Sequence, residues 1–245
     1  MSPHEKGLTV EIVQNNKFII PLYHGTSSIF INSILQYGFS AKNPIKTLNI
    51  LPFYEKLYKI CDELFGIDSD WTNGRWLYKN IKDQKQNIGS SNFRHGATYL
   101  SPNRNTAAYY AIKNQFGSEI LSEAIKLYNK INNYAPERLL KFRELPVVQM
   151  LNGKPWPVLF EIFNMDLQIM KSEKGEKIED IINLLKQDFK VFSQQSNFVL
   201  TKYFMIDQFK LYKIVVTEEQ QRQLLPSYYL NEIDPAKFKE LSDKN

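Results

Sequence analysis

The sequence predicts a single α+β domain that carries a helical insertion. Short apolar segments of strand character alternate with segments whose apolar residues recur at helical spacing. Residues from about 43 to 91 differ from their surroundings because they are aromatic, basic and helix-like throughout. A chain of 245 residues with 43% hydrophobic content is long enough to bury a substantial core. We therefore expect one domain over 1–245, with the insertion at about 43–91.

Composition excludes several classes of protein. A single cysteine, Cys61, rules out an internal disulfide and a cysteine-rich metal site, and three histidines are too few for a typical zinc cluster. The N-terminus is polar, and no run of about 18 apolar residues is present to span a membrane. We therefore expect a cytoplasmic protein that uses no metal and no membrane. The formal charge of +5 favours acidic partners such as nucleic acid, although ordinary surface composition gives the same balance.

The N-terminal elements converge on a histidine and a glycine. His24 follows a predicted strand directly, and Ser27 or Ser28 is placed to cap the next helix. Gly38 stands at the C-terminal end of that helix, where a residue in the left-handed conformation commonly forms the C-cap. The expected elements here are strands at 10–13 and 18–23, a polar turn at 14–17 and a helix from 28 to 38.

The insertion is predicted to be helical at 50–65 and 71–81, where apolar residues recur at helix-like intervals. Its polar faces carry four cations, Arg75, Lys79, Lys82 and Lys85. A basic and aromatic lid that recognises the substrate is one interpretation, and a helical flap with solvated lysines is the plainer one.

The second half of the chain continues the alternation of strands and helices. Asn105 or Thr106 is expected to cap a helix whose small residues, Ala107 and Ala108, allow a close approach to a strand. The other expected elements are strands at 96–102, 157–163 with a prolongation at 167–170, 197–200 and 209–216, helices at 119–132, 136–142 and 178–189, a charged turn at 171–177, and a helical or loose tail from 218.

Three motifs in order carry a family resemblance. They are Tyr23-His24-Gly25-Thr26, then Gly96-Ala97-Thr98-Tyr99-Leu100-Ser101, then Tyr109-Tyr110 in an alanine-rich helix. This order resembles the ADP-ribosyltransferase superfamily, in its diphtheria-toxin and poly-ADP-ribose-polymerase branch, over residues 22–216 with the insertion excepted. The resemblance implies split mixed or antiparallel β-sheets that form an NAD cleft and are flanked by helices.

The resemblance also implies how NAD, the co-substrate, is held. Gly25 lacks a side chain, so its N–H and C=O can approach the carboxamide of the nicotinamide. Tyr99 and Tyr110 would stack on the nicotinamide ring, which mainly orients it. His24 would contact the ribose on the adenosine side and act in catalysis with Tyr99. The full set implied to bind NAD is His24, Gly25, Thr26, Tyr99, Ser101 and Tyr110.

The part of the implied site beyond His24 and the tyrosines, here called the third wall, departs from the family pattern. That branch commonly has a glutamate at the start of a later strand, where the carboxylate orients the ribose and stabilises positive charge. Here the matching strand begins with Asn197, and Gln195 lies two residues before it. Glu161 is the other nearby acid, on the preceding strand. Members without the glutamate transfer single ADP-ribose units or are inactive, so we do not expect polymer synthesis.

These features together predict an NAD-dependent mono-ADP-ribosyltransferase, with an intracellular toxin or defence effector as its biological role. The basic insertion favours a nucleic-acid acceptor, RNA or DNA, and an antitoxin protein would be a partner of such an effector. Three alternatives stay open: a protein acceptor, a tRNA 2′-phosphotransferase-like activity, and a non-catalytic module that binds NAD or ADP-ribose. The Arg-His-Arg-Arg pattern of the phosphotransferases is not traceable in this sequence.

Overall fold

The computed structural model describes residues 11–40, 42–66, 71–83, 96–150, 154–217, 226–236 and 238. It is a mixed α+β structure in which every named strand pair is antiparallel. A four-stranded sheet has the order β3 (Leu22–Ser27), β5 (Pro157–Ile162), β8 (Phe209–Val216) and β9 (Tyr228–Ile233). A three-stranded sheet has the order β4 (Tyr99–Leu100), β7 (Phe198–Leu200) and β6 (Met170–Ser172), and a two-stranded ribbon joins β1 (Val13–Gln14) to β2 (Lys17–Phe18).

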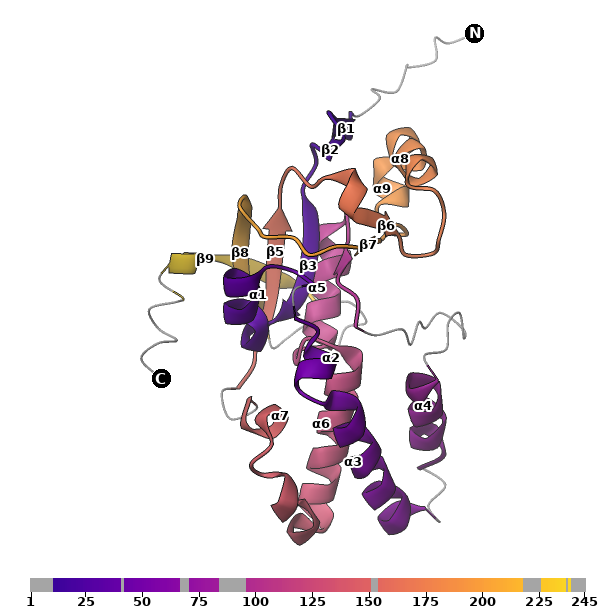
Figure 1. Ribbon diagram of the computed structural model, residues 1–245, viewed down its shortest axis with the longest axis vertical. Helices are drawn as coiled ribbons and strands as arrows, with labels where there is room; N and C mark the ends of the chain where they lie inside the picture. The colour runs from indigo at the N-terminus through magenta and orange to yellow at the C-terminus, as the bar shows by residue number, and fades with distance from the viewer. Residues whose placement is uncertain are drawn as a thin grey trace.

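The helices divide between the two ends of the molecule. Figure 1 shows the strands together in the upper part, with α1, α5, α8 and α9 around them, and α3, α4, α6 and α7 in the lower part. The helices are η1 (Ser28–Phe30), α1 (Ile31–Tyr37), α2 (Pro44–Thr47), α3 (Ile50–Phe65), α4 (Thr72–Lys82), α5 (Arg104–Lys113), α6 (Glu119–Tyr134), η3 (Pro136–Phe142), α7 (Pro146–Gln149), η5 (Leu167–Ile169), α8 (Ile178–Gln187) and α9 (Phe189–Phe192).

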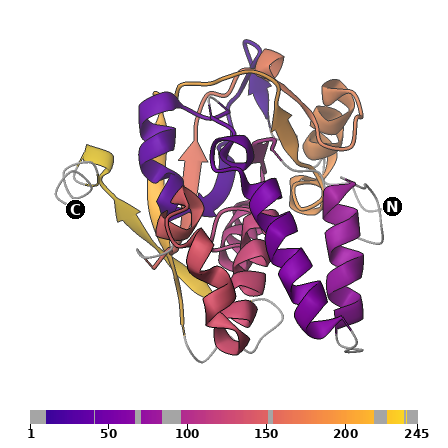
Figure 2. The same cartoon turned by 60° about the horizontal axis from the view of Figure 1, so that its bottom comes forward.

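The described helices of the predicted insertion pack into the rest of the domain. Figure 2 shows α3 and α4 beside the helices that follow α5, and α3 packs along α6. The ring of Phe53 on α3 meets that of Phe142 edge to face, with centroids 5.8 Å apart. One hydrophobic cluster runs from these helices to both larger sheets. The insertion therefore shares its core with the rest of the domain.

Helix α4 is attached to α3 by stacked aromatic rings. The rings of Tyr58 and Tyr78 lie 3.8 Å apart and almost parallel. The indole N–H of Trp71 donates to Asp62, which also accepts from the Arg75 guanidinium. This packing covers Ile81 and partly covers Leu77 and Tyr78, and it leaves Lys79 and Lys82 exposed.

Helix α5 lies directly on β3, and a glycine makes this approach possible. A Cβ atom built on Gly25 would stand 1.9 Å from the carbonyl oxygen of Ala107 and 3.2 Å from the Cβ of Ala111. Both alanines and Ala108 are buried against the sheet. Thus small side chains on the helix and none on the strand set the helix-to-sheet distance.

The structure corrects the predicted boundaries of the first elements. Strand β3 continues to Ser27 because β5 pairs with it as far as Pro157, so His24 lies inside the strand and not at its end. Ser27 precedes η1, but its side chain makes no capping bond, and its hydroxyl is buried without a partner among the described residues. Gly38 does end α1, with a φ of +76°.

Later boundaries also differ from the predictions. Asn103, rather than Asn105 or Thr106, caps α5 by accepting the N–H of Thr106 at 3.0 Å. The segment 167–170 does not prolong β5, because it forms η5 and then enters the other sheet as the start of β6. The predicted helical or loose tail contains strand β9, whereas the residues between 218 and 225 lie outside the described part of the chain.

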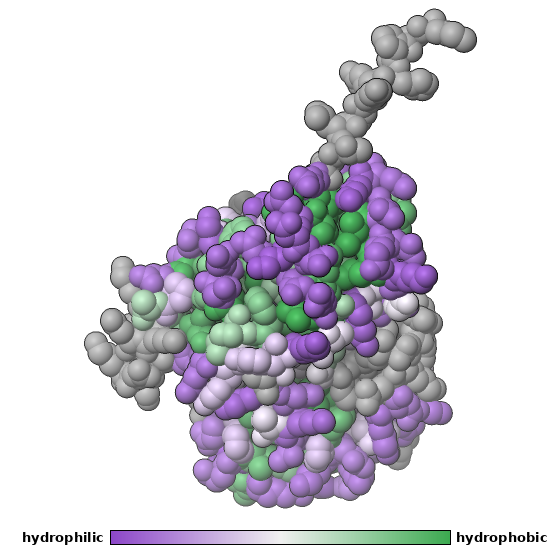
Figure 3. Space-filling model, turned by 45° about the horizontal axis from the view of Figure 1, so that its top comes forward, coloured by the Kyte–Doolittle hydropathy of each residue, from purple (hydrophilic) through white to green (hydrophobic). Residues whose placement is uncertain are grey.

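Hydrophilic residues cover most of the face in Figure 3, with hydrophobic residues reaching the surface between them. Exposed large hydrophobic side chains include Ile19, Val191 and Met205. No helix in the described ranges has both the length and the apolar character needed to cross a membrane.

We predict that Gly25→Ala is strongly destabilising. The new methyl group would overlap a backbone oxygen that α5 cannot move without leaving the sheet, so the free energy of unfolding should fall by about 3 kcal/mol. Gly175→Ala is the matched control, because a Cβ there meets nothing within 4 Å and carries only the cost of a φ of +89°, about 1–2 kcal/mol. Urea unfolding measures both, and a Gly25→Ala protein as stable as the control would contradict this packing.

Candidate functional site

The candidate site is a cavity where the two larger sheets meet. The N–H of Tyr23 donates to the carbonyl oxygen of Ser101 at 2.8 Å, and the N–H of Ser101 donates back at 2.9 Å. This bridge ties β3 to the end of β4. Beyond it the strands separate around a cavity of about 470 Å³. The cavity is lined by six residues predicted to bind NAD, namely His24, Gly25, Thr26, Tyr99, Ser101 and Tyr110, and also by Asn197.

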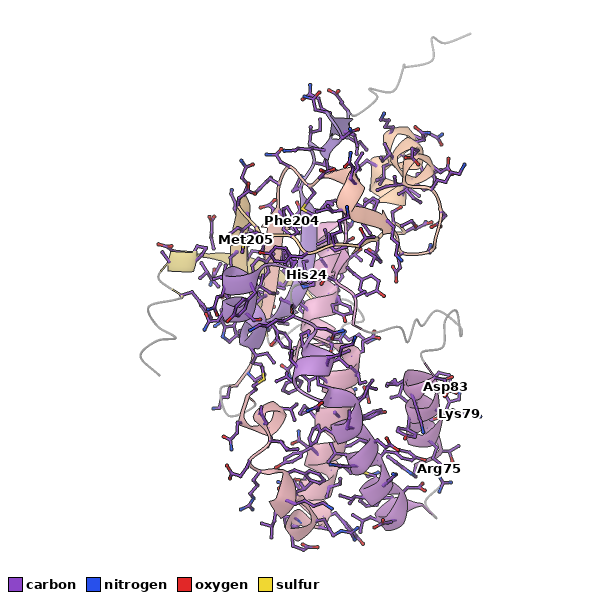
Figure 4. The ribbon with its side chains drawn as sticks, in the orientation of Figure 1. His24, Arg75, Lys79, Asp83, Phe204 and Met205 are labelled. Carbon is purple, nitrogen blue, oxygen red and sulfur yellow. The ribbon has the colours of Figure 1, made fainter. Side chains whose placement is uncertain are left out.

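His24 is locked in one orientation on the cavity wall. Its Nδ1 lies 2.9 Å from the carbonyl oxygen of Tyr99, which can only accept, so Nδ1 carries the proton. Its ring meets Phe39 edge to face at 4.9 Å, and Phe39 pairs with Phe204. Figure 4 shows His24 and Phe204 in the same region at the edge of the sheets. This leaves Nε2 as the hydrogen-bond acceptor of the imidazole.

Burial keeps His24 uncharged. Part of the ring is solvent accessible, but protein atoms surround it, and the loss of hydration lowers its pKa to about 4. The hydrogen bond to the Tyr99 carbonyl opposes this shift and is the weaker influence. The imidazole is therefore a neutral hydrogen-bonding group at pH 7, not a cation.

The peptide groups of Gly25 face the open edge of β3. In an antiparallel strand, the N–H and C=O of alternate residues point to the same side. Tyr23 uses both groups to bond Ser101, so those of Gly25, two residues on, point to the same side and into the cavity. The missing side chain has a separate cause, since it makes room for α5 and not for a ligand.

Tyr99 and Tyr110 reach the cavity from β4 and α5. Tyr110 lines the cavity and is 40% exposed, and reduced hydration of its hydroxyl raises its pKa above the ordinary value. Its neighbour Tyr109 points elsewhere and packs against Tyr228 with ring centroids 5.7 Å apart. Of the two adjacent tyrosines, the cavity therefore receives the one that the spacing from Tyr99 predicted.

Thr26 and Ser101 also line the cavity and are almost fully buried, with 3% and 4% of their surface exposed. The Ser101 hydroxyl accepts the N–H of Asn103, which begins the turn into α5. Ser101 thus shapes the entry to α5 as well as lining the site.

The third wall contains a carboxylate that sequence analysis missed. Asn197 lines the cavity, and its amide donates to the carboxylate of Glu173 at 2.9 Å. The N–H of Glu173 in turn donates to the carbonyl oxygen of Asn197 at 3.0 Å. Because β6 pairs with β7 antiparallel, the residue after β6 stands beside the residue before β7. The signal lay in the sequence 171–177, which was interpreted only as a charged turn.

Two other candidates for this wall lie elsewhere. Gln195 is exposed and does not line the cavity. Glu161 accepts hydrogen bonds from the hydroxyls of Tyr23 and Tyr212, on the sheet face that α5 covers, and it is also outside the cavity lining. The carboxylate of the site is therefore not the one that the strand order suggested.

Further charged groups complete the cavity. Lys42 and Lys113 line it from the loop before α2 and from the end of α5. Glu119, the first residue of α6, also lines it, and burial raises the pKa of its carboxyl. Sequence analysis singled out none of the three. Among the described residues, no three or more His, Cys, Asp or Glu side chains are grouped so that they could hold a metal ion.

Comparisons of this chain with protein-family models, with curated proteins and with solved structures find no significant match.

We predict that His24 makes the protein less stable in mild acid. A histidine whose folded pKa lies below its unfolded value of about 6.5 stabilises the fold above that pH, and this contribution is lost as the pH falls toward 4. Between pH 7.5 and 5, the expected loss is about 2 kcal/mol, and His24→Gln should lack it in urea unfolding. In NMR spectra, one imidazole should titrate near pH 4 and be missing from the variant; a midpoint near 6.5 would refute the burial of this ring.

Proposed function

We propose that the chain is an NAD-dependent mono-ADP-ribosyltransferase. The observation that carries the proposal is that one cavity is lined by six residues implied to bind NAD and by a carboxylate, Glu173, hydrogen-bonded to Asn197. These groups come from β3, β4, α5 and the β6 and β7 ends, which are far apart in the sequence. Their convergence on one site supports a shared chemical task.

The cavity fits the chemical groups of NAD. Its volume of about 470 Å³ is in the range of small-molecule sites. The inward peptide groups of Gly25 suit a carboxamide, which needs one donor and one acceptor. Tyr99 and Tyr110 offer aromatic faces for a flat ring, and Lys42 and Lys113 offer positive charge for a pyrophosphate.

NAD supplies a glycosidic bond whose leaving group, nicotinamide, departs as a neutral molecule. The chain's own groups would hold the two ends of this bond. Gly25, Tyr99 and Tyr110 fix the nicotinamide. The Nε2 atom of neutral His24 accepts a hydrogen bond from a ribose hydroxyl. The Glu173 carboxylate, kept in place by Asn197, orients the other ribose and stabilises the positive charge that develops on it.

The carboxylate of Glu173 in the cavity affects the choice between an enzyme and a non-catalytic binding module. A non-catalytic binding module was suggested mainly by the missing glutamate, and a carboxylate on the third wall weakens that suggestion. Asn197 still stands where polymer-forming relatives in the resembled branch have glutamate, which favours transfer of single units. A role as an intracellular effector with an antitoxin partner remains a prediction.

Glu173→Gln tests the proposal. Removing the negative charge should slow nicotinamide release from NAD by about 100- to 1000-fold, since one stabilising electrostatic contact typically contributes this much. Glu176→Gln is the matched control, because Glu176 accepts a hydrogen bond from Ser172 in the same turn but does not line the cavity.

Labelled NAD mixed with RNA, DNA and protein pools identifies the acceptor. The proposal fails if wild-type protein releases no nicotinamide and labels none of the pools.

A nucleic-acid acceptor is favoured by the outer face of α4. This helix has no acidic residue, and Trp76, Lys79 and Lys82 are exposed on it, with Trp76 51% exposed. Figure 4 labels Lys79 on α4, and Arg75 on the same helix is not part of this face, because its guanidinium donates to Asp62 of α3 at 2.8 Å. Ile81, at the end of α4, lines the cavity, so the basic face begins at the cavity wall. Lysines next to an aromatic ring suit a single strand, which offers phosphates and stacked bases.

Reversing the charge of α4 tests this acceptor. Lys79→Glu combined with Lys82→Glu should raise the KM for RNA or DNA and reduce the salt dependence of that KM by about one unit per lost phosphate contact. Lys186→Glu, an equally exposed change on α8, is the control. An unchanged KM and salt dependence in the double variant would contradict a nucleic-acid acceptor bound by α4 and would favour a protein acceptor.

A further inference from the structure

The cavity contains a second carboxylate, which the start of α6 supplies. Glu119 is the first residue of α6, and Ser118 before it caps that helix by accepting the N–H of Leu121 at 3.2 Å. This cap fixes where the backbone of Glu119 lies. The side chain of Glu119 lines the cavity beside Tyr110 and interacts electrostatically with Glu173.

The surroundings of Glu119 make it a stronger base than a surface glutamate. Loss of hydration in the cavity raises its pKa most, and the negative charges of Glu123 and Glu173 raise it further. Lys113, at the end of α5, acts in the opposite direction. The first turn of a helix also favours the ionised form. Glu119 is exposed to the solvent of the cavity, and with its pKa raised it takes up a proton more readily than an ordinary glutamate does.

The two carboxylates have different settings. Glu173 accepts a hydrogen bond from the Asn197 amide at 2.9 Å, which fixes its position. Glu119 is an exposed side chain on the cavity wall, beside Tyr110. Two acids of one site whose environments differ are typical of enzymes in which one stabilises charge and the other transfers a proton.

We infer that Glu119 is the general base that removes a proton from the acceptor, and that the acceptor is an uncharged N–H or O–H nucleophile such as a nucleobase or a hydroxyl. This inference rests on the proposed function and adds to it the chemical class of the second substrate.

The proton and electron balance of the step requires such a group. The bond between the ribose anomeric carbon and the nicotinamide nitrogen breaks, and its electron pair leaves with nicotinamide, which becomes neutral. The acceptor nitrogen or oxygen forms the new bond to the same carbon and loses its proton to the Glu119 carboxylate. Solvent then takes the proton, so the net products are the modified acceptor, nicotinamide and H⁺.

The pair of carboxylates also disfavours another class of acceptor. An aspartate or glutamate side chain of a target protein is already ionised, so it needs no base. Its negative charge would be repelled by both Glu119 and Glu173 in a poorly hydrated cavity. A neutral nucleophile meets neither obstacle, and this agrees with the basic outer face of α4.

The test compares Glu119→Gln and Glu119→Ala with wild-type protein, using labelled NAD and mixed RNA, single-stranded DNA and protein pools. Both variants should lose about 100-fold or more in the rate of transfer, which is the usual contribution of a general base. The acid limb of the wild-type pH profile, where transfer falls as the Glu119 carboxylate is protonated, should disappear in Glu119→Gln. Added formate or acetate should restore part of the rate in Glu119→Ala, where it can occupy the vacated space.

Glu123→Gln is the matched control, because Glu123 lies one turn further along α6, pairs with Lys126 and does not line the cavity. It should keep wild-type transfer at neutral pH and retain the acid limb, which moves to slightly lower pH because the Glu123 charge helps to raise the pKa of Glu119. The inference is overturned if Glu119→Gln transfers as well as wild type, or if it loses activity but keeps the acid limb and Glu119→Ala is not rescued. Label found mainly on protein carboxylates would also overturn it. Wild-type protein that releases no nicotinamide would instead overturn the proposed function on which it rests.

Discussion

The contact between α5 and β3 is the constraint on which the rest of the site depends. The carbonyl oxygen of Ala107 occupies the space that a side chain at Gly25 would need, so the helix lies as close to the strand as backbone atoms allow. One turn later the same helix carries Tyr110 to the cavity. The Tyr23–Ser101 bridge attaches β4 to the same strand and brings Tyr99 with it. Three walls of the cavity therefore take their positions from β3.

The remaining walls come from two less regular connections. The turn between β6 and α8 places Glu173 beside Asn197, and the start of α6 places Glu119 on the cavity wall. Asn43 links the start of the predicted insertion to the segment that follows it. Its side-chain oxygen caps α2 by accepting the N–H of Ile45, and its side-chain NH₂ donates to the carbonyl oxygen of Gly96 at 3.3 Å. Asn43, Gly96 and Ile81 all line the cavity, so the two helices of the insertion that the structure describes lie next to the site.

The electrostatic character of the cavity follows from this construction. Protein atoms around His24 and around the exposed Glu119 reduce the hydration of both groups, and their pKa values respond in opposite directions, since burial disfavours the charged form of each. The pKa of the imidazole falls and that of the carboxyl rises. One site thus provides a neutral hydrogen-bonding ring, a fixed carboxylate and a more basic carboxylate, with Lys42 and Lys113 supplying positive charge.

The sequence by itself determined the elements that local pattern specifies. Helical periodicity predicted α3, α4 and the start of α6, and the order of His24, Tyr99 and Tyr110 predicted residues that meet at one cavity. Only the tertiary structure decided the third wall and the reason for Gly25. Glu173 reaches the site through the antiparallel register of two short strands, which depends on long-range hydrogen bonds and leaves no periodic trace in a charged turn. The need for glycine comes from a helix more than 80 residues away, and no local pattern records that contact.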